Sequence, residues 1–160
     1  HLMAGYGLRP GEIAALKRGS IDWQEGTLTV EQSKTSSVLV LPLSPDTVEV
    51  LRKYDDRRDS APLDAPLFAS AQPPFGAMSP CAVSVRFKVH ARRSGLPITD
   101  ASAYALRHSF AMRLLGAGVG VKLIGDLLGH RSLASTSTYL RIQTDMLRDA
   151  ALDMPAQVAP

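Results

Sequence analysis

The chain has 160 residues, 45% of them hydrophobic, so it is long enough to bury a substantial core without stabilising disulfides or metals. Its 18 Lys and Arg residues against 15 Asp and Glu residues give a formal charge of +3, which permits a phosphate-binding face without requiring one. The single cysteine, Cys81, excludes an intramolecular disulfide, and no Cys/His cluster has the spacing of a zinc site. A lone cysteine suits a reducing cytoplasm, which is the setting we expect. No apolar run approaches the ~20 residues of a membrane helix, so we expect a soluble protein without a membrane partner.

The N-terminal part of the chain predicts a short helix followed by a β-hairpin. Pro10 stands at a favoured first helical position, so a helix should begin there. Runs rich in β-formers at 26–31 and 38–41 flank a turn, and 21–23 is compatible with an edge strand. Lys34 would occupy the tip of this hairpin.

Two serine-proline pairs predict the next helices. Ser44-Pro45 and Ser79-Pro80 each combine a capping serine with a proline at the first helical position, which favours helices near 45–57 and 80–94. A proline-rich loop, from about 60 to 78, should separate them.

Three shorter helical segments are expected in the C-terminal part. On the first, Leu106, Phe110 and Leu114 recur every four residues and form an apolar face, whereas Tyr104 and Arg107 share another face. The second spans 121–128 and ends at a glycine, and the third begins near residue 132. Together these elements predict a mainly α fold with a small antiparallel β-sheet, of the α+β class.

Residues suited to phosphoryl transfer lie in two motifs of the C-terminal part. Tyr139 follows His130 by nine residues, and Arg107 lies in the run Tyr-Ala-Leu-Arg-His-Ser-Phe-Ala. In-line attack on a phosphodiester needs a nucleophile, and the charge that builds on the equatorial oxygens needs fixed donors. Tyr139 is therefore a candidate nucleophile and Arg107 a candidate donor. Because a phenol with a pKa near 10 is a poor nucleophile, further cations are needed, and Arg9 and Lys34 are the best placed.

These motifs resemble, in order and spacing, those of the tyrosine site-specific recombinases, also called the phage integrase family. In that family an arginine follows Gly-Leu and precedes a glutamate, as Arg9 and Glu12 do here, and a lysine lies in a hairpin turn, as Lys34 does. The second family box, His-x-Leu-Arg-His-Thr/Ser-Phe-Ala, matches 106–111. The third, Leu-Gly-His with a tyrosine nine residues later, matches 128–130 and the tyrosine at position 139.

The resemblance implies a tyrosine recombinase catalytic-domain fold and a site-specific recombinase or integrase that cleaves and rejoins double-stranded DNA through a 3′-phosphotyrosyl intermediate. It implies other protomers in a synaptic complex, a bacterial or phage source, and no metal or nucleotide cofactor. It implies that Tyr139 is the nucleophile and that Lys34 is the general acid for the leaving 5′ oxygen. The implied donors to the scissile phosphate are Arg9, Arg107 and His130. Glu12 and His108 would be orienting residues.

One position departs from the family pattern. The family usually has a histidine, able to accept the proton of the nucleophile, where this chain has Tyr104. A tyrosine with a pKa near 10 can form a hydrogen bond but is a poor base at neutral pH. We therefore expect cleavage that is slower or shifted toward higher pH.

The resemblance covers nearly the whole chain, so we expect residues 1–160 to form a single catalytic domain that lacks the N-terminal DNA-clamping domain of the family. The tail over 144–160 is helix-compatible, and its apolar residues could contact another protomer or fold back in cis.

Ordinary structural roles remain as alternatives for each residue. Lys34 could be a solvated turn lysine, His130 could only bond the last carbonyl groups of a helix, and Arg107 could be a buried partner of an acid. At the level of the whole chain, the alternatives are a noncatalytic DNA-binding module and a type IB topoisomerase-like DNA relaxer.

Overall fold

The computed structural model describes residues 1–32, 37–58, 61–71, 73, 75–95 and 102–129 of the chain. The chain divides into two units, 1–111 and 112–160, and the division falls within a helix. Each unit is described below by itself, the second from its residues 112–129.

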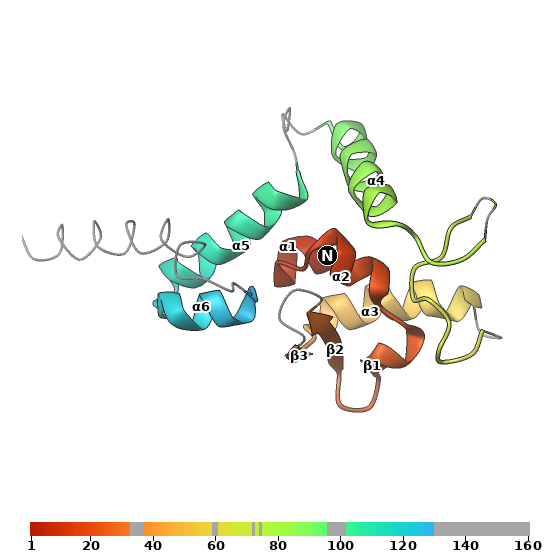
Figure 1. The fold of residues 1–160 in the computed structure, drawn as a ribbon, viewed down its shortest axis with the longest axis horizontal. Coiled ribbons are helices and arrows are strands. Elements are labelled where there is room, and N and C mark those ends of the chain that lie inside the picture. The colour runs from red at the N-terminus through yellow and green to blue at the C-terminus, as the bar shows by residue number, and fades with distance from the viewer. Residues whose placement is uncertain (33–36, 59–60, 72, 74, 96–101, 130–160) are drawn as a thin grey trace, which may run out of the picture. The chain divides into compact units, whose positions relative to one another are not determined.

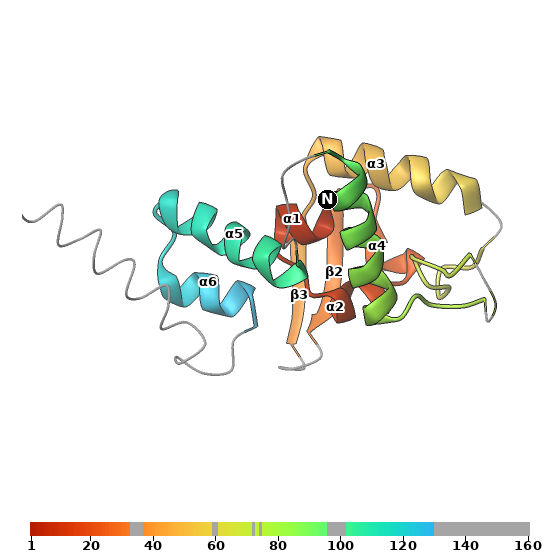
Figure 2. The ribbon, with the colours of Figure 1, turned by 90° about the horizontal axis from the view of Figure 1, so that it is seen from above.

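The first unit contains a three-stranded antiparallel sheet of order β1-β2-β3 (Figures 1 and 2). Its strands are β1 (Ile21–Asp22), β2 (Thr27–Gln32) and β3 (Ser37–Pro42), and Leu28 of β2 pairs with both Ile21 and Leu41. Burial alternates along β2, as expected for a sheet with one face against the core. The hairpin and edge strand expected from the sequence are therefore present.

Four helices lie wholly in this unit. They are α1 (Leu2–Tyr6), α2 (Pro10–Ala15), α3 (Pro45–Asp55) and α4 (Pro80–Arg93), and α5 (Ala103–Gly116) begins in this unit. Three of the four, α2, α3 and α4, begin where the sequence predicts. Two 3₁₀ turns, η1 (Arg18–Ser20) and η2 (Asp56–Arg58), follow α2 and α3.

Both predicted serine caps form. The Ser44 hydroxyl accepts the backbone N–H of Thr47 at 3.3 Å, and the Ser79 hydroxyl accepts that of Ala82 at 3.1 Å. In each helix a proline follows the capping serine. At this first helical position a backbone N–H would have no partner within the helix, so its absence in proline costs no hydrogen bond.

The sequence did not predict α1, because a five-residue helix that contains Gly5 has little intrinsic helical signal. Burial of Leu2, which is 6% exposed, and a glycine at the helix end stabilise it instead. Tertiary packing thus outweighs weak local propensity here.

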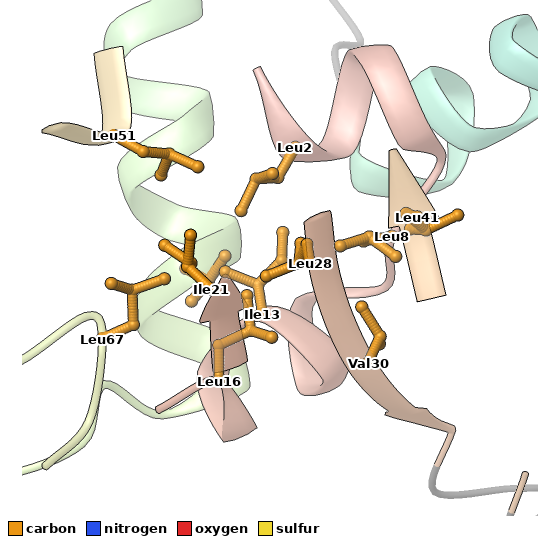
Figure 3. Close-up of a cluster of buried hydrophobic side chains, with 11 residues drawn as sticks. Leu2, Leu8, Ile13, Leu16, Ile21, Leu28, Val30, Leu41, Leu51 and Leu67 are labelled. Carbon is orange, nitrogen blue, oxygen red and sulfur yellow. The ribbon is translucent and has the colours of Figure 1, made fainter. Parts of the chain in front are cut away.

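The core lies between one face of the sheet and the helices (Figure 3). Leu28 at the centre of β2 is fully buried, and α2 packs against both β2 and α4. Side chains from α1, α2, α3 and α4 join the same cluster, respectively Leu2, Ile13, Leu51 and Val83. This packing fixes α2, whose first turn carries Glu12, against the sheet.

The loop after α3 is tied to the core at two points. Leu67 is fully buried, and its backbone N–H donates to the Leu16 carbonyl at 2.7 Å. Arg18 pairs in bidentate fashion with Asp55, at 2.6 and 2.8 Å, and also donates to the Ala61 carbonyl. The predicted loop is therefore ordered where its apolar anchor and this ion pair lie.

The described part of the second unit contains the C-terminal end of α5 and the whole of α6 (Val121–Leu127). Leu128 caps α6, and Gly129 follows with φ 58°, as expected for a glycine that ends a helix. The third predicted helical segment, from residue 132, and the tail over 144–160 lie outside the described residues. Within the residues that the structure describes, no helix is long and apolar enough to cross a membrane.

Leu28→Ala should lower the free energy of unfolding by about 3 kcal/mol, because it removes a fully buried side chain from the central strand. Val40 points from the opposite face of the neighbouring strand and is 57% exposed, so Val40→Ala should cost less than about 1 kcal/mol. Urea unfolding of both variants measures the difference, and equal losses would contradict the assigned inner face of the sheet.

Candidate arginine site

Glu12, in the first turn of α2, is the centre of the candidate site. It is only 3% exposed, and its Oε2 accepts the backbone N–H of Arg9 at 2.7 Å, which closes the N-terminus of the helix. Its Oε1 accepts Nη1 of the Arg9 side chain, also at 2.7 Å. One carboxylate thus holds both the backbone and the guanidinium of Arg9.

Arg107 reaches the same carboxylate from α5. Its Nη1 lies 3.9 Å from Oε2 of Glu12 and donates to the Gly7 carbonyl at 2.6 Å. The Arg107 side chain is 10% exposed, whereas that of Arg9 is 22% exposed. The fold therefore brings together the two arginines that the sequence placed in separate motifs.

Gly7 provides its carbonyl from a backbone conformation that favours glycine. With φ 65° and ψ 21°, it ends α1 in the left-handed region, and its N–H donates to the Met3 carbonyl at 3.1 Å. In the sequence Gly7 is the first residue of a Gly-Leu-Arg motif, which by itself predicts no contact for its carbonyl. A glycine two residues before Arg9 was the available signal, but its partner 100 residues away could not be predicted from local sequence.

The trio of Glu12, Arg9 and Arg107 carries a net charge of +1 when each group is ionised. A guanidinium is planar and presents its donors in a fork that suits two oxygens of a phosphate. Glu12 offsets part of the cost of placing two cations close together and fixes where each points. Chemically, the arrangement suits an anion that carries several oxygens.

Tyr104 and Arg107 do not share one environment, although both lie on α5. Tyr104 is 78% exposed and Arg107 is 9% exposed. The buried stripe of α5 follows Arg107 and Ala111, four residues apart, and Tyr104 lies on the same side of the helix but in its first turn, where it is exposed. The predicted apolar face, formed by Leu106, Phe110 and Leu114, is only half-buried.

His108 follows Arg107 directly and is half-buried. Three other predicted site residues, Lys34, His130 and Tyr139, lie outside the described residues. The strand ends that flank Lys34 are described, and there the Ser37 hydroxyl donates to Gln32 Oε1 at 2.9 Å. Among the described side chains, no group of three or more His, Cys, Asp and Glu residues could hold a metal ion.

A family model described as "Phage integrase family" matches residues 1–146. The chain belongs to the phage integrase family. This membership confirms the family inferred from the motifs. The fold class is confirmed as well, since the described elements are mainly helices with a small antiparallel sheet.

Curated relatives of the chain carry the names of integrases and recombinases. The integrase/recombinase y4gC of Sinorhizobium fredii is 38% identical over 155 residues, which are 96% of this chain and 80% of y4gC. The tyrosine recombinase XerA of Pyrococcus furiosus is 33% identical over 151 residues, covering 93% of this chain and 51% of XerA. The chain thus spans about half the length of XerA, and it spans 38% of a further relative, y4rF.

Solved structures of recombinases share the fold. A crystal structure of XerA recombinase matches with a TM-score of 0.74 and 25% identity, over 97% of this chain and 56% of that one. XerH site-specific recombinase bound to difH substrate matches with a TM-score of 0.72 and 22% identity, over 96% of this chain and 45% of that one. The second likeness concerns the fold alone.

Glu12→Gln should lower the free energy of unfolding by about 3 kcal/mol, because it leaves Arg9 and Arg107 without their buried counter-charge. Glu49→Gln is the matched control, since Glu49 pairs with Lys53 on the surface and its side chain is 64% exposed. We expect that control to change stability by less than about 0.5 kcal/mol. Chemical denaturation compares the two, and an equally small effect at Glu12 would show that the carboxylate does not hold the site together.

Proposed function

We propose that this chain is the catalytic domain of a site-specific DNA recombinase that cleaves and rejoins DNA through a 3′-phosphotyrosyl intermediate. The observation that carries the proposal is the convergence of Arg9 and Arg107 on the buried carboxylate of Glu12. A pair of fixed guanidinium groups is what a phosphodiester needs when negative charge builds on its nonbridging oxygens. The Xer relatives, which carry recombinase names, support the same reading.

In this mechanism the Tyr139 oxygen attacks phosphorus in line and, because Tyr104 is a poor base, passes its proton to water as the P–O bond forms. The bond from phosphorus to the 5′ oxygen breaks, and Lys34 donates a proton to that leaving oxygen. Arg9, Arg107 and His130 stabilise the pentavalent transition state. Because the phosphotyrosyl ester keeps the energy of the broken bond, a 5′ hydroxyl can reverse the reaction and rejoin the strands without a nucleotide or a metal.

The exposed face of α4 supports DNA as the partner. The segment from Pro80 to Arg93 contains no acidic residue. Its exposed cations are Arg86, Lys88, Arg92 and Arg93. Such a group of cations attracts the phosphate backbone irrespective of sequence. Assembly with other protomers in a synaptic complex, and a setting in the cytoplasm of a bacterial or phage-infected cell, belong to the same proposal.

Tyr139→Phe should abolish covalent attachment to DNA, because it removes the attacking oxygen and keeps the ring. The measurement is an SDS-resistant protein–DNA adduct formed on nicked suicide duplexes from the genomic neighbourhood. Tyr54→Phe is the control, because the half-buried Tyr54 contacts Phe68 and has no predicted role at the site, so this variant should form adduct like the unaltered chain.

Three other results would contradict parts of this proposal. An adduct that persists in Tyr139→Phe would exclude Tyr139 as the nucleophile. DNA binding without any adduct would favour a noncatalytic DNA-binding module. Relaxation of supercoiled DNA by a lone protomer, without strand exchange, would favour a type IB topoisomerase-like relaxer.

Tyr104→His should raise the cleavage rate at pH 7 by about tenfold, because a neutral imidazole accepts a proton far better than a phenol does. The gain should be present above the imidazole pKa of about 6.5 and should fade as the pH falls below it. Since Tyr104 is 78% exposed, the substitution should leave stability unchanged. Cleavage rates between pH 5 and 9, with Tyr104→Phe as the control, test this, and identical profiles for all three proteins would show that position 104 accepts no proton.

A further inference from the structure

We propose that Tyr6 is a positioning residue that, through the Gly7 carbonyl, holds the Arg107 guanidinium in the orientation that DNA cleavage needs. This inference rests on the proposed function and adds to it Tyr6, which directly precedes the Gly-Leu-Arg motif. It follows from hydrogen bonds between three segments, namely the end of α1, the start of α3 and α5.

The Tyr6 hydroxyl lies at the N-terminus of α3. It accepts the backbone N–H of Ser44, the capping residue of that helix, at 2.7 Å. Burial raises the pKa of Tyr6, but hydrogen bonds from the side chain of Thr47 and from the backbone and side chain of Ser44 outweigh it, so the pKa lies below its ordinary value. The phenol oxygen therefore acts as an acceptor for the first turn of α3, and the last residue of α1 is fastened there.

Gly7 follows Tyr6 directly, so the hydrogen bond of Tyr6 to α3 also restrains the backbone of Gly7. Its left-handed conformation sets the direction of its carbonyl, and that carbonyl accepts Arg107 Nη1 at 2.6 Å. Both Gly7 and Leu8 are buried, so the peptide has little room to adjust on the side of the core. With Tyr6 fixed on one side and the buried Leu8 on the other, the direction of the carbonyl is restrained, and its hydrogen bond restrains the guanidinium in turn.

Arg107 has a second anchor that differs in kind. Its contact with Glu12 is an ion pair at 3.9 Å, longer than a hydrogen bond and less directional. The 2.6 Å bond to the Gly7 carbonyl is the directional contact of the two. Loosening the carbonyl should therefore rotate the guanidinium without removing its charge from the site.

The test is Tyr6→Phe, which removes one oxygen and keeps the ring. Cleavage is measured on two suicide duplexes, one with an ordinary phosphodiester and one with a methylphosphonate at the scissile position. The methyl group removes the negative charge that an arginine would stabilise, so a defect that acts through Arg107 should matter much less on the second duplex. Arg107→Ala serves as the reference for such a defect, and Tyr54→Phe is the matched control for loss of a phenol hydroxyl.

Tyr6→Phe should slow cleavage of the phosphodiester about fivefold, which corresponds to the loss of one ordinary hydrogen bond, and should cleave the methylphosphonate within about twofold of the unaltered chain. Arg107→Ala should lose about a hundredfold on the phosphodiester and far less on the methylphosphonate. Equal losses of Tyr6→Phe on both duplexes, or no loss on either, would overturn the inference and leave the proposed function intact. No adduct with the unaltered chain would count against the proposed function instead.

A measurement without DNA decides the geometric part independently. Nuclear magnetic resonance of the Arg107 guanidinium reports how fast it rotates and exchanges its protons. Tyr6→Phe should speed both, and Tyr54→Phe should change neither. Unchanged Arg107 signals in a folded Tyr6→Phe protein would overturn the inference, whatever the cleavage assays give.

Discussion

The organisation of the candidate site depends on one buried carboxylate. Two guanidinium groups cannot lie close together in a largely dry environment unless an opposite charge lies between them, and Glu12 provides it for both Arg9 and Arg107. The same carboxylate closes the N-terminus of α2 by accepting the Arg9 backbone N–H. One side chain therefore couples the start of a helix to the placement of two cations from distant parts of the chain.

The hydrophobic core determines where that carboxylate lies. Ile13 and Leu16 place α2 against β2, whose buried residues Leu28 and Val30 alternate with exposed ones (Figure 3). A helix that packs against the core on one face cannot rotate about its axis without breaking those contacts. Glu12 therefore keeps its position at the site. The same core packing that stabilises the first unit therefore also holds Glu12 in place at the site.

Local patterns predicted much of this fold. The serine-proline caps set the starts of α3 and α4, and the β-rich runs identified the hairpin, because each signal lies within a few residues of its consequence. The contacts of the site were harder to predict. The bond from Arg107 to the Gly7 carbonyl joins residues 100 positions apart and uses a backbone atom, which carries no side-chain signature. Helical spacing also could not tell that Tyr104, on the same side of α5 as the buried Arg107, is exposed, because that depends on whether other elements cover the first turn of the helix.

The use of a main-chain carbonyl to hold Arg107 has a consequence for how this protein can evolve. A side-chain partner can be lost by a single codon change, whereas every residue at position 7 would still bring a carbonyl group. What selection must preserve there is the left-handed backbone, since a residue with a Cβ atom would adopt φ 65° only under strain. Sequence drift at position 7 is therefore restricted by the shape of the backbone and not by the chemistry of a side chain.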